Sequence, residues 1–195
     1  MGNAQPATRS GTTLRDICER AKLKEDAKAL LKDDFTPRQF LELLIGKELF
    51  LDAIRFLAYA LPKREAVGWG CLCVRQVLGT QDASKISEAH VAVERWVSNP
   101  DEGNRRAAKI AADKEGSESP SACLALAAFF SGGSIAPANL APVAPADHIT
   151  PQLVAGAIIV SAVKNQPEKA PEKYRVFLQK GMALMARMQS GPKPV

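Results

Sequence analysis

Apolar residues recur along most of this chain at the three- and four-residue spacing of an amphipathic helix. The clearest case is residues 47–61, where Phe50, Ile54, Leu57 and Leu61 fall on one face. Alternating patterns typical of strands are nearly absent, and plentiful Ala and Leu also favour helices. The pattern predicts an all-α fold, a single compact domain of about eight to nine short antiparallel helices in an irregular bundle or a short solenoid-like stack.

Proline directly after a capping residue marks several of the predicted helix starts. Thr36 precedes Pro37, and Gln39 completes the pattern of a capping box. Asn99 before Pro100 predicts a second start of this kind, with Asn99 as the cap. Such closely spaced signals imply short links between the helices.

The stretch from Pro120 to Val163 carries one formal charge, Asp147, although 24% of the whole chain is charged. It divides into two apolar helical segments, Ala122–Phe130 and Leu153–Val163, joined by a loop rich in Gly and Pro at residues 131–150. An uncharged segment must be buried in the protein's own core or against a partner. We therefore expect the two segments to be the central helices and the loop to cross the surface, with its prolines near polyproline II geometry.

We expect one folded domain over residues 12–190, with disordered tails at 1–11 and 191–195. The polar start of the chain has no apolar core of a secretory signal, and no apolar run reaches the ~18–20 residues that span a membrane. The expected location is therefore cytoplasmic. The four cysteines lack the spacing of zinc or redox sites and are predicted to be free thiols in a reducing compartment: Cys18, Cys71, Cys73 and Cys123.

The net charge of +5 comes from the C-terminal part of the chain. Up to Val163 there are 19 basic and 19 acidic residues, and from Lys164 onward there are seven basic and two acidic ones. This excess on a predicted helix over residues 171–189, together with a small basic face at Arg105 and Arg106, suggests binding to nucleic acid or anionic membrane. Few aromatic residues accompany these charges and no recognised nucleic-acid module fits, so a solvated basic face is the simpler interpretation.

Candidate catalytic residues are few. The only two histidines are His90, on a predicted helix, and His148, beside Asp147 at the end of the loop. No metal, nucleotide or nucleophile-elbow motif is present, and no cofactor is expected. One hypothesis is an enzyme with an unrecognised site near His148, in which Asp147 acts with Cys123 or Ser134.

The favoured hypothesis is a non-enzymatic module that binds a protein partner. A stiff, apolar loop loses little conformational entropy on binding, and no small-molecule substrate is evident from the sequence. The residues predicted to contact the partner are the apolar positions of the loop and one tryptophan, which can anchor an interface: Ile135, Pro137, Leu140, Pro142, Val143, Pro145 and Trp96.

Four segments together resemble an uncharacterised bacterial all-helical family. They are TPRQFLELL (36–44), DAIRFLAYALPKREAVGWGCLC (52–73), NPDEGNRRAA (99–108) and SACLALAAFFSGGSIAPANLAPVAP (121–145). The most specific part is SGGSIAP with the proline-rich run after it. Such proteins are similar to ones encoded beside type VI secretion genes. The resemblance implies an accessory or adaptor role in secretion, and it brings no established activity and no site residues.

Overall fold

The computed structural model describes residues 12–79, 86–116, 118–137 and 139–189, and every regular element within them is helical. The helices are α1 (Leu14–Arg20), α2 (Glu25–Lys28), α3 (Pro37–Gly46), α4 (Phe50–Ala60), α5 (Lys63–Leu78), α6 (Glu88–Ser98), α7 (Glu102–Glu115), α8 (Pro120–Phe129), α9 (Ile149–Lys164), the 3₁₀ turn η2 (Pro167–Lys169) and α10 (Ala170–Gln189). The all-α prediction is confirmed, with ten α-helices in these residues rather than eight or nine. Both predicted disordered tails lie outside the described residues.

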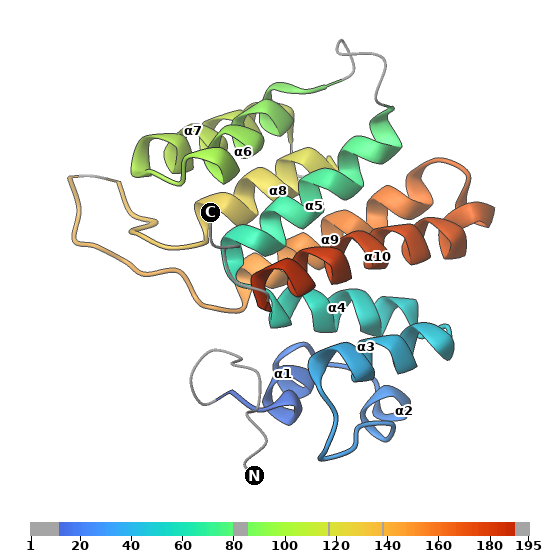
Figure 1. Ribbon diagram of the computed structural model, residues 1–195. Coiled ribbons are helices and arrows are strands. Elements are labelled where there is room, and N and C mark those ends of the chain that lie inside the picture. Colours follow the sequence, from blue (N-terminus) through green and yellow to red (C-terminus); the bar gives the residue numbers. More distant parts are fainter. Residues whose placement is uncertain (1–11, 80–85, 117, 138, 190–195) are drawn as a thin grey trace, which may run out of the picture.

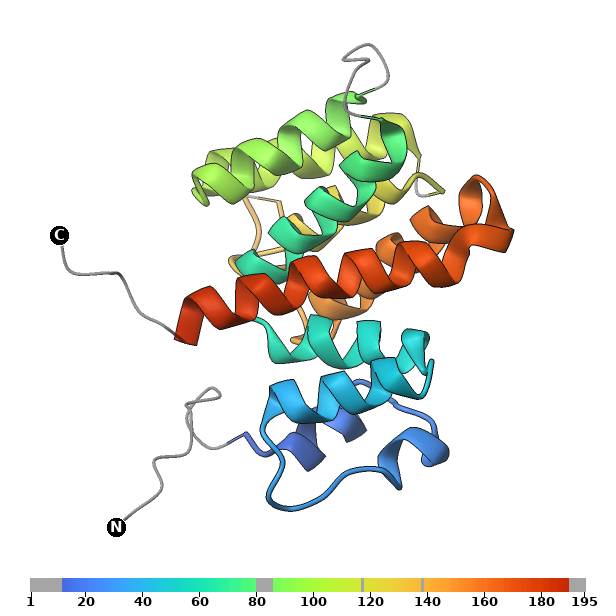
Figure 2. The ribbon, with the colours of Figure 1, turned by 45° about the vertical axis from the view of Figure 1, so that its right-hand side comes forward.

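The helices are arranged in tiers, which follow one another from bottom to top in Figure 1. Helices α1 to α3 lie on one side of α4, and α5, α9 and α10 lie on its other side. Helices α6 and α7 form the opposite end and pack on α8. Figure 2 shows the same order in a turned view, with α10 crossing in front of α5 and α9. Helices far apart in the chain thereby cover one another, since α4 packs on α9 and α10 and α5 packs on α8 and α9.

Helices α8 and α9 are the central pair, as their lack of charge predicts. Eight of the ten residues of α8 are buried, and this helix packs against α5, α6, α7 and α9. Helix α9 packs against α4, α5, α8 and α10, but Gly156, Val160 and Val163 on its outer side are exposed. The two uncharged helices are therefore mainly core, with one open apolar side on α9.

The capping signals are confirmed at one helix and corrected at another. Thr36 Oγ1 accepts from the backbone N–H of Gln39 at 3.2 Å, and Gln39 Oε1 accepts from the N–H of Thr36 at 2.9 Å. The prediction that Asn99 caps the next helix is wrong, because Asn99 itself ends α6. Asp101 caps α7 instead, accepting from the N–H of Asn104 at 2.7 Å. A carboxylate also suits the positive end of the helix dipole.

Helix α10 approaches α4 and α5 closely at Gly181. Trp69 Nε1 on α5 donates to the carbonyl of Phe177 at 2.7 Å, and this bond is buried. A Cβ at Gly181 would lie 2.4 Å from Leu57 Cδ2 and 2.9 Å from two atoms of the Trp69 ring. The contact between α10 and the core therefore requires glycine at this position.

We predict that Gly181→Ala lowers the free energy of unfolding by about 1–3 kcal/mol, because the added methyl overpacks a rigid, buried ring. This loss should outweigh the gain of about 1 kcal/mol in helix propensity. Gly156→Ala is the matched control, since nothing lies within 4 Å of a Cβ there. Urea denaturation should show stabilisation for Gly156→Ala; equal stabilisation of both variants would contradict the close approach at Gly181.

Candidate functional site

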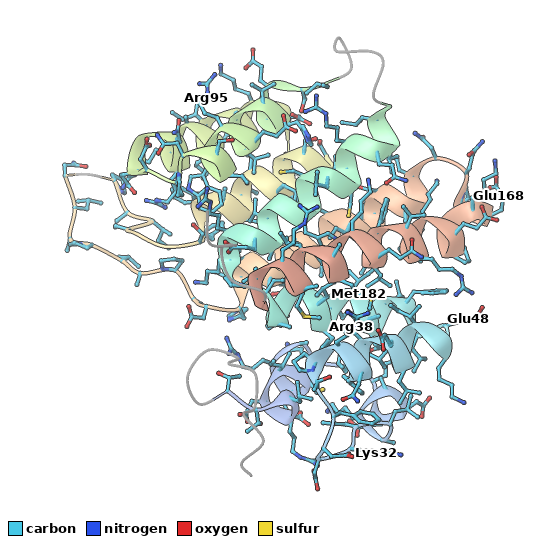
Figure 3. All side chains as sticks on the ribbon, in the orientation of Figure 1. Lys32, Arg38, Glu48, Arg95, Glu168 and Met182 are labelled. Carbon is cyan, nitrogen blue, oxygen red and sulfur yellow. The ribbon has the colours of Figure 1, made fainter. Side chains whose placement is uncertain are left out.

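The chain between α8 and α9, residues 131–148, is called the apolar loop below. It leaves the body of the molecule beside α8 and returns at the start of α9 (Figure 1). Figure 3 shows its side chains standing apart from the helices. The loop has no formal charge until Asp147. It is therefore the one long connection that presents apolar groups away from the core among the described residues.

Arg105 on α7 fixes the beginning of the apolar loop. Its buried guanidinium donates to the carbonyl of Phe129, at the end of α8, and to the carbonyl of Ser134 at 2.8 Å. Glu102, one turn earlier, accepts from Arg105 Nε at 2.7 Å and from Nη2 at 2.8 Å. The guanidinium carbon also lies 4.8 Å from the centre of the Phe129 ring. One side chain thus joins α7, α8 and the loop.

Arg106 reinforces this attachment from the next position of α7. Its Nη2 donates to the carbonyls of Ser134 at 3.3 Å and Ala136 at 3.2 Å. The hydrogen bonds from Arg105 and Arg106 to Glu102 hold the pKa of this carboxyl at about 2. The sequence presented the two arginines as a basic face, but they bind loop carbonyls and share a carboxylate. The three- and four-residue spacing from Glu102 could have predicted these ion pairs from the sequence. The carbonyl partners could not be predicted in this way, because they are distant in the chain.

Backbone bonds tie the two limbs of the apolar loop together. The N–H of Ile135 donates to the carbonyl of Val143 at 2.9 Å, and the N–H of Val143 donates to Ser134 Oγ at 3.0 Å. Between the limbs, the N–H of Leu140 donates to the carbonyl of Pro137 at 3.0 Å, closing a turn. The loop therefore has internal order of its own.

The far end of the apolar loop is attached to α4 and α5. Lys63 Nζ lies 2.8 Å from Asp147 Oδ1, and the Tyr59 hydroxyl donates to the carbonyl of His148 at 3.4 Å. One residue into α9, the buried Thr150 Oγ1 donates to a carbonyl of α8 at 3.1 Å. Both ends of the loop are thus fixed to the helical body.

The apolar loop exposes most of the residues predicted to contact a partner. Leu140 is 59% exposed and Val143 is 50% exposed. Pro137 and Pro142 are also exposed, while Ile135 and Pro145 are half-buried. The exposed apolar groups therefore gather at the tip and on the returning limb.

Trp96 does not belong to this surface. It is only 4% exposed and forms part of the core beneath α6. The structure therefore removes Trp96 from the predicted contact residues, because the apolar face of α6 packs on α7 and α8.

The residues named in the enzyme hypothesis take part in contacts that hold the loop in place or are partly buried. Asp147 is bound to Lys63, and the carbonyl of His148 accepts from Tyr59. Ser134 Oγ accepts backbone N–H groups inside the loop. Burial raises the pKa of the Cys123 thiol, which opposes formation of a nucleophilic thiolate. None of these contacts supports a catalytic role.

Two cations of the basic C-terminal helix bind groups of the protein itself. Lys173 Nζ donates to the carbonyl of Ala162 at 2.9 Å and to that of Gln166 at 3.3 Å, at the end of α9. Arg175 Nη2 lies 2.6 Å from Glu48 Oε1, a residue labelled beside α10 in Figure 3. These bonds stabilise the packing of α10 and favour a structural role for its cations.

In the described residues no group of three His, Cys, Asp or Glu side chains could hold a metal ion. The same residues include no helix with the length and apolarity to cross a membrane. Cys18, Cys71 and Cys73 are buried and form no disulfide, and burial raises the pKa of Cys71 to about 12 and that of Cys18 to about 11.

His90 is a buried polar residue whose surroundings were not visible in the sequence. Its Nδ1 lies 3.4 Å from Ser121 Oγ, and its Nε2 lies 3.3 Å from Glu94 Oε1, which also binds Arg75 at 2.6 Å. Ser121 lines a cavity of about 280 Å³ between the ends of α5, α6, α8 and α9. Burial is the main cause that lowers the pKa of His90, so its ring is neutral in the core.

Comparison with known protein families matches residues 40–185, most of the chain, to a family described as "Family of unknown function (DUF6931)". The matched residues run from α3 into α10 and include the whole apolar loop and both arginines that hold it. No curated protein matches the chain, and no solved structure does.

We predict that Arg105→Ala lowers the free energy of unfolding by about 2–4 kcal/mol, because the buried Phe129 carbonyl loses its donor and the Ser134 carbonyl keeps only the longer bond from Arg106. Arg106→Ala is the control and should cost about 1 kcal/mol or less, because its side chain is partly exposed. Urea denaturation measures both effects, and limited proteolysis should cut the loop faster in Arg105→Ala. Equal stability of the two variants would contradict the role of Arg105.

We predict that the protein loses stability as the pH falls below about 6.5, the ordinary pKa of histidine. Because the pKa of His90 is lowered in the folded state, the unfolded state binds the proton first. The loss should continue down to the folded-state pKa of His90. Urea denaturation between pH 7.5 and 5.5, with His90→Leu as the comparison, measures this slope. An unchanged slope in His90→Leu would contradict the assignment.

Proposed function

The chain belongs to the DUF6931 family of unknown function, and we propose that it is a non-enzymatic protein–protein interaction module. In this proposal it acts as an accessory or adaptor protein of a bacterial secretion system, of the type VI kind suggested by the sequence resemblance. Its partner is a protein, a secretion component or an effector, and no cofactor takes part.

The observation that carries the proposal is an apolar loop that is both exposed and fixed. Leu140 and Val143 are at least half exposed, although their neighbours give no charge to keep the loop solvated. Arg105 and Lys63 fix its two ends. Because each side chain is already about half buried, burying the remainder against a partner would stabilise a complex by about 1–1.5 kcal/mol each. Little conformational entropy would be lost, since the loop is already ordered.

The apolar side of α9 extends the exposed apolar surface of the chain. Val160 is 43% exposed and Val163 is 41% exposed, on a helix without a charge before Lys164. Exposed apolar groups gathered on uncharged segments are typical of interaction surfaces. The loop remains the central feature of the proposal, because Leu140 and Val143 are more exposed than Val160 and Val163.

We predict that Leu140→Asp combined with Val143→Asp reduces partner recovery at least tenfold, because two charges would have to be desolvated at the interface. The measurement is affinity isolation with tagged protein from the native host, followed by quantitative mass spectrometry. The free energy of unfolding should change by less than about 0.5 kcal/mol, as is usual for exposed sites.

Leu72→Asp on α5 is the matched control, since Leu72 is 50% exposed like Val143 but lies outside the loop. It should recover the partner as the native chain does. Recovery of the same stoichiometric partner by the loop variant and the native chain would overturn the proposal.

A further inference from the structure

The returning limb of the apolar loop contains two prolines three residues apart, in the sequence Pro142-Val143-Ala144-Pro145. Residues 141–146 form neither a helix nor a turn. Pro142 and Val143 are exposed, and Pro145 is half-buried. This short segment is therefore largely exposed and outside any regular element.

The sequence restricts the backbone of this segment strongly. The rings of Pro142 and Pro145 fix φ near about −65°. Ala141 and Ala144 each precede a proline, which disfavours the helical region for them. Two of the six residues at 141–146 are thereby fixed at φ and two more are biased toward extended or polyproline II geometry. A polyproline II helix has about three residues per turn, so Pro142 and Pro145 share one edge and Val143 and Ala146 share another.

The protein fixes this segment at Val143 and again just after its end, at Asp147. The N–H and carbonyl of Val143 are bonded to Ser134 Oγ and to the N–H of Ile135. The nearest charge in the chain, Asp147, is bound to Lys63 at 2.8 Å. Recognition of residues 141–146 therefore depends on apolar contacts and on shape.

We propose that residues 141–146 are a polyproline II ligand, and that the partner is a protein domain with a groove lined by aromatic side chains. This inference rests on the proposed function and specifies its partner. Grooves of this kind accept prolines spaced three apart between aromatic rings, and they favour a ligand that is already extended. Ala144 between the prolines, and Ala141 and Ala146 beside them, are small enough to let aromatic side chains pack on both proline rings.

The first test uses the full chain and the partner recovered with it. Pro142→Ala combined with Pro145→Ala should weaken binding to the isolated partner at least tenfold by titration calorimetry. Pro137→Ala is the matched control, an exposed proline of the same loop outside the segment, and it should change binding less than twofold. Circular dichroism and urea denaturation establish that all variants are folded.

The second test uses a synthetic peptide with the sequence Asn139–Asp147 and a copy in which both prolines are alanine. The native peptide should displace the full chain from the partner at a concentration at least tenfold lower than the alanine copy. It should also shift the tryptophan or tyrosine NMR signals of the partner. Equal competition by both peptides, as in strand addition, would overturn the inference.

The outcomes separate this inference from the proposed function. If Leu140→Asp with Val143→Asp abolishes binding but the proline variants bind normally, the interaction module stands and the polyproline ligand is wrong. Recovery of a second copy of this chain as the sole partner would also overturn the aromatic groove. If every loop variant binds the partner normally, the proposed function itself fails.

Discussion

Burial of the two uncharged helices constrains the rest of the structure. Neither α8 nor α9 has a charged side that could face water before Lys164, so other helices must cover them. Helices α5, α6 and α7 cover α8, and α4, α5 and α10 cover α9. The connection between the two must then run outside the core. An apolar loop at the surface is therefore a consequence of how the core is built.

Arg105 connects this core to the loop. It is a buried cation on α7, and its charge is balanced by Glu102 and by carbonyl oxygens of α8 and the loop. Such multidentate binding is suited to a guanidinium and not to a lysine ammonium. Order in the loop thus depends on the packing of α7 against α8. A change in that packing would alter the surface offered to a partner.

The sequence predicted the helices and the central pair because both follow from local patterns of charge and spacing. It could not decide between Asn99 and Asp101 as a cap, since both are good capping residues and only the end of α6 selects one. It could not show that Trp96 faces the core. The bond from Arg105 to Ser134 joins residues 29 apart, and no local pattern encodes it. The exposed loop residues were predictable, but their attachments were not.

The central claim is that the apolar loop is ordered before any partner binds, and ¹⁵N relaxation of the free protein tests it most directly. Amides such as Ile135 and Val143, which are hydrogen-bonded, report on the loop, and amides of α8 serve as the rigid reference. The account predicts order parameters near those of a rigid backbone, about 0.8 or higher. Values below about 0.6 across the loop would contradict it, because the loop would then be flexible on the ps–ns timescale.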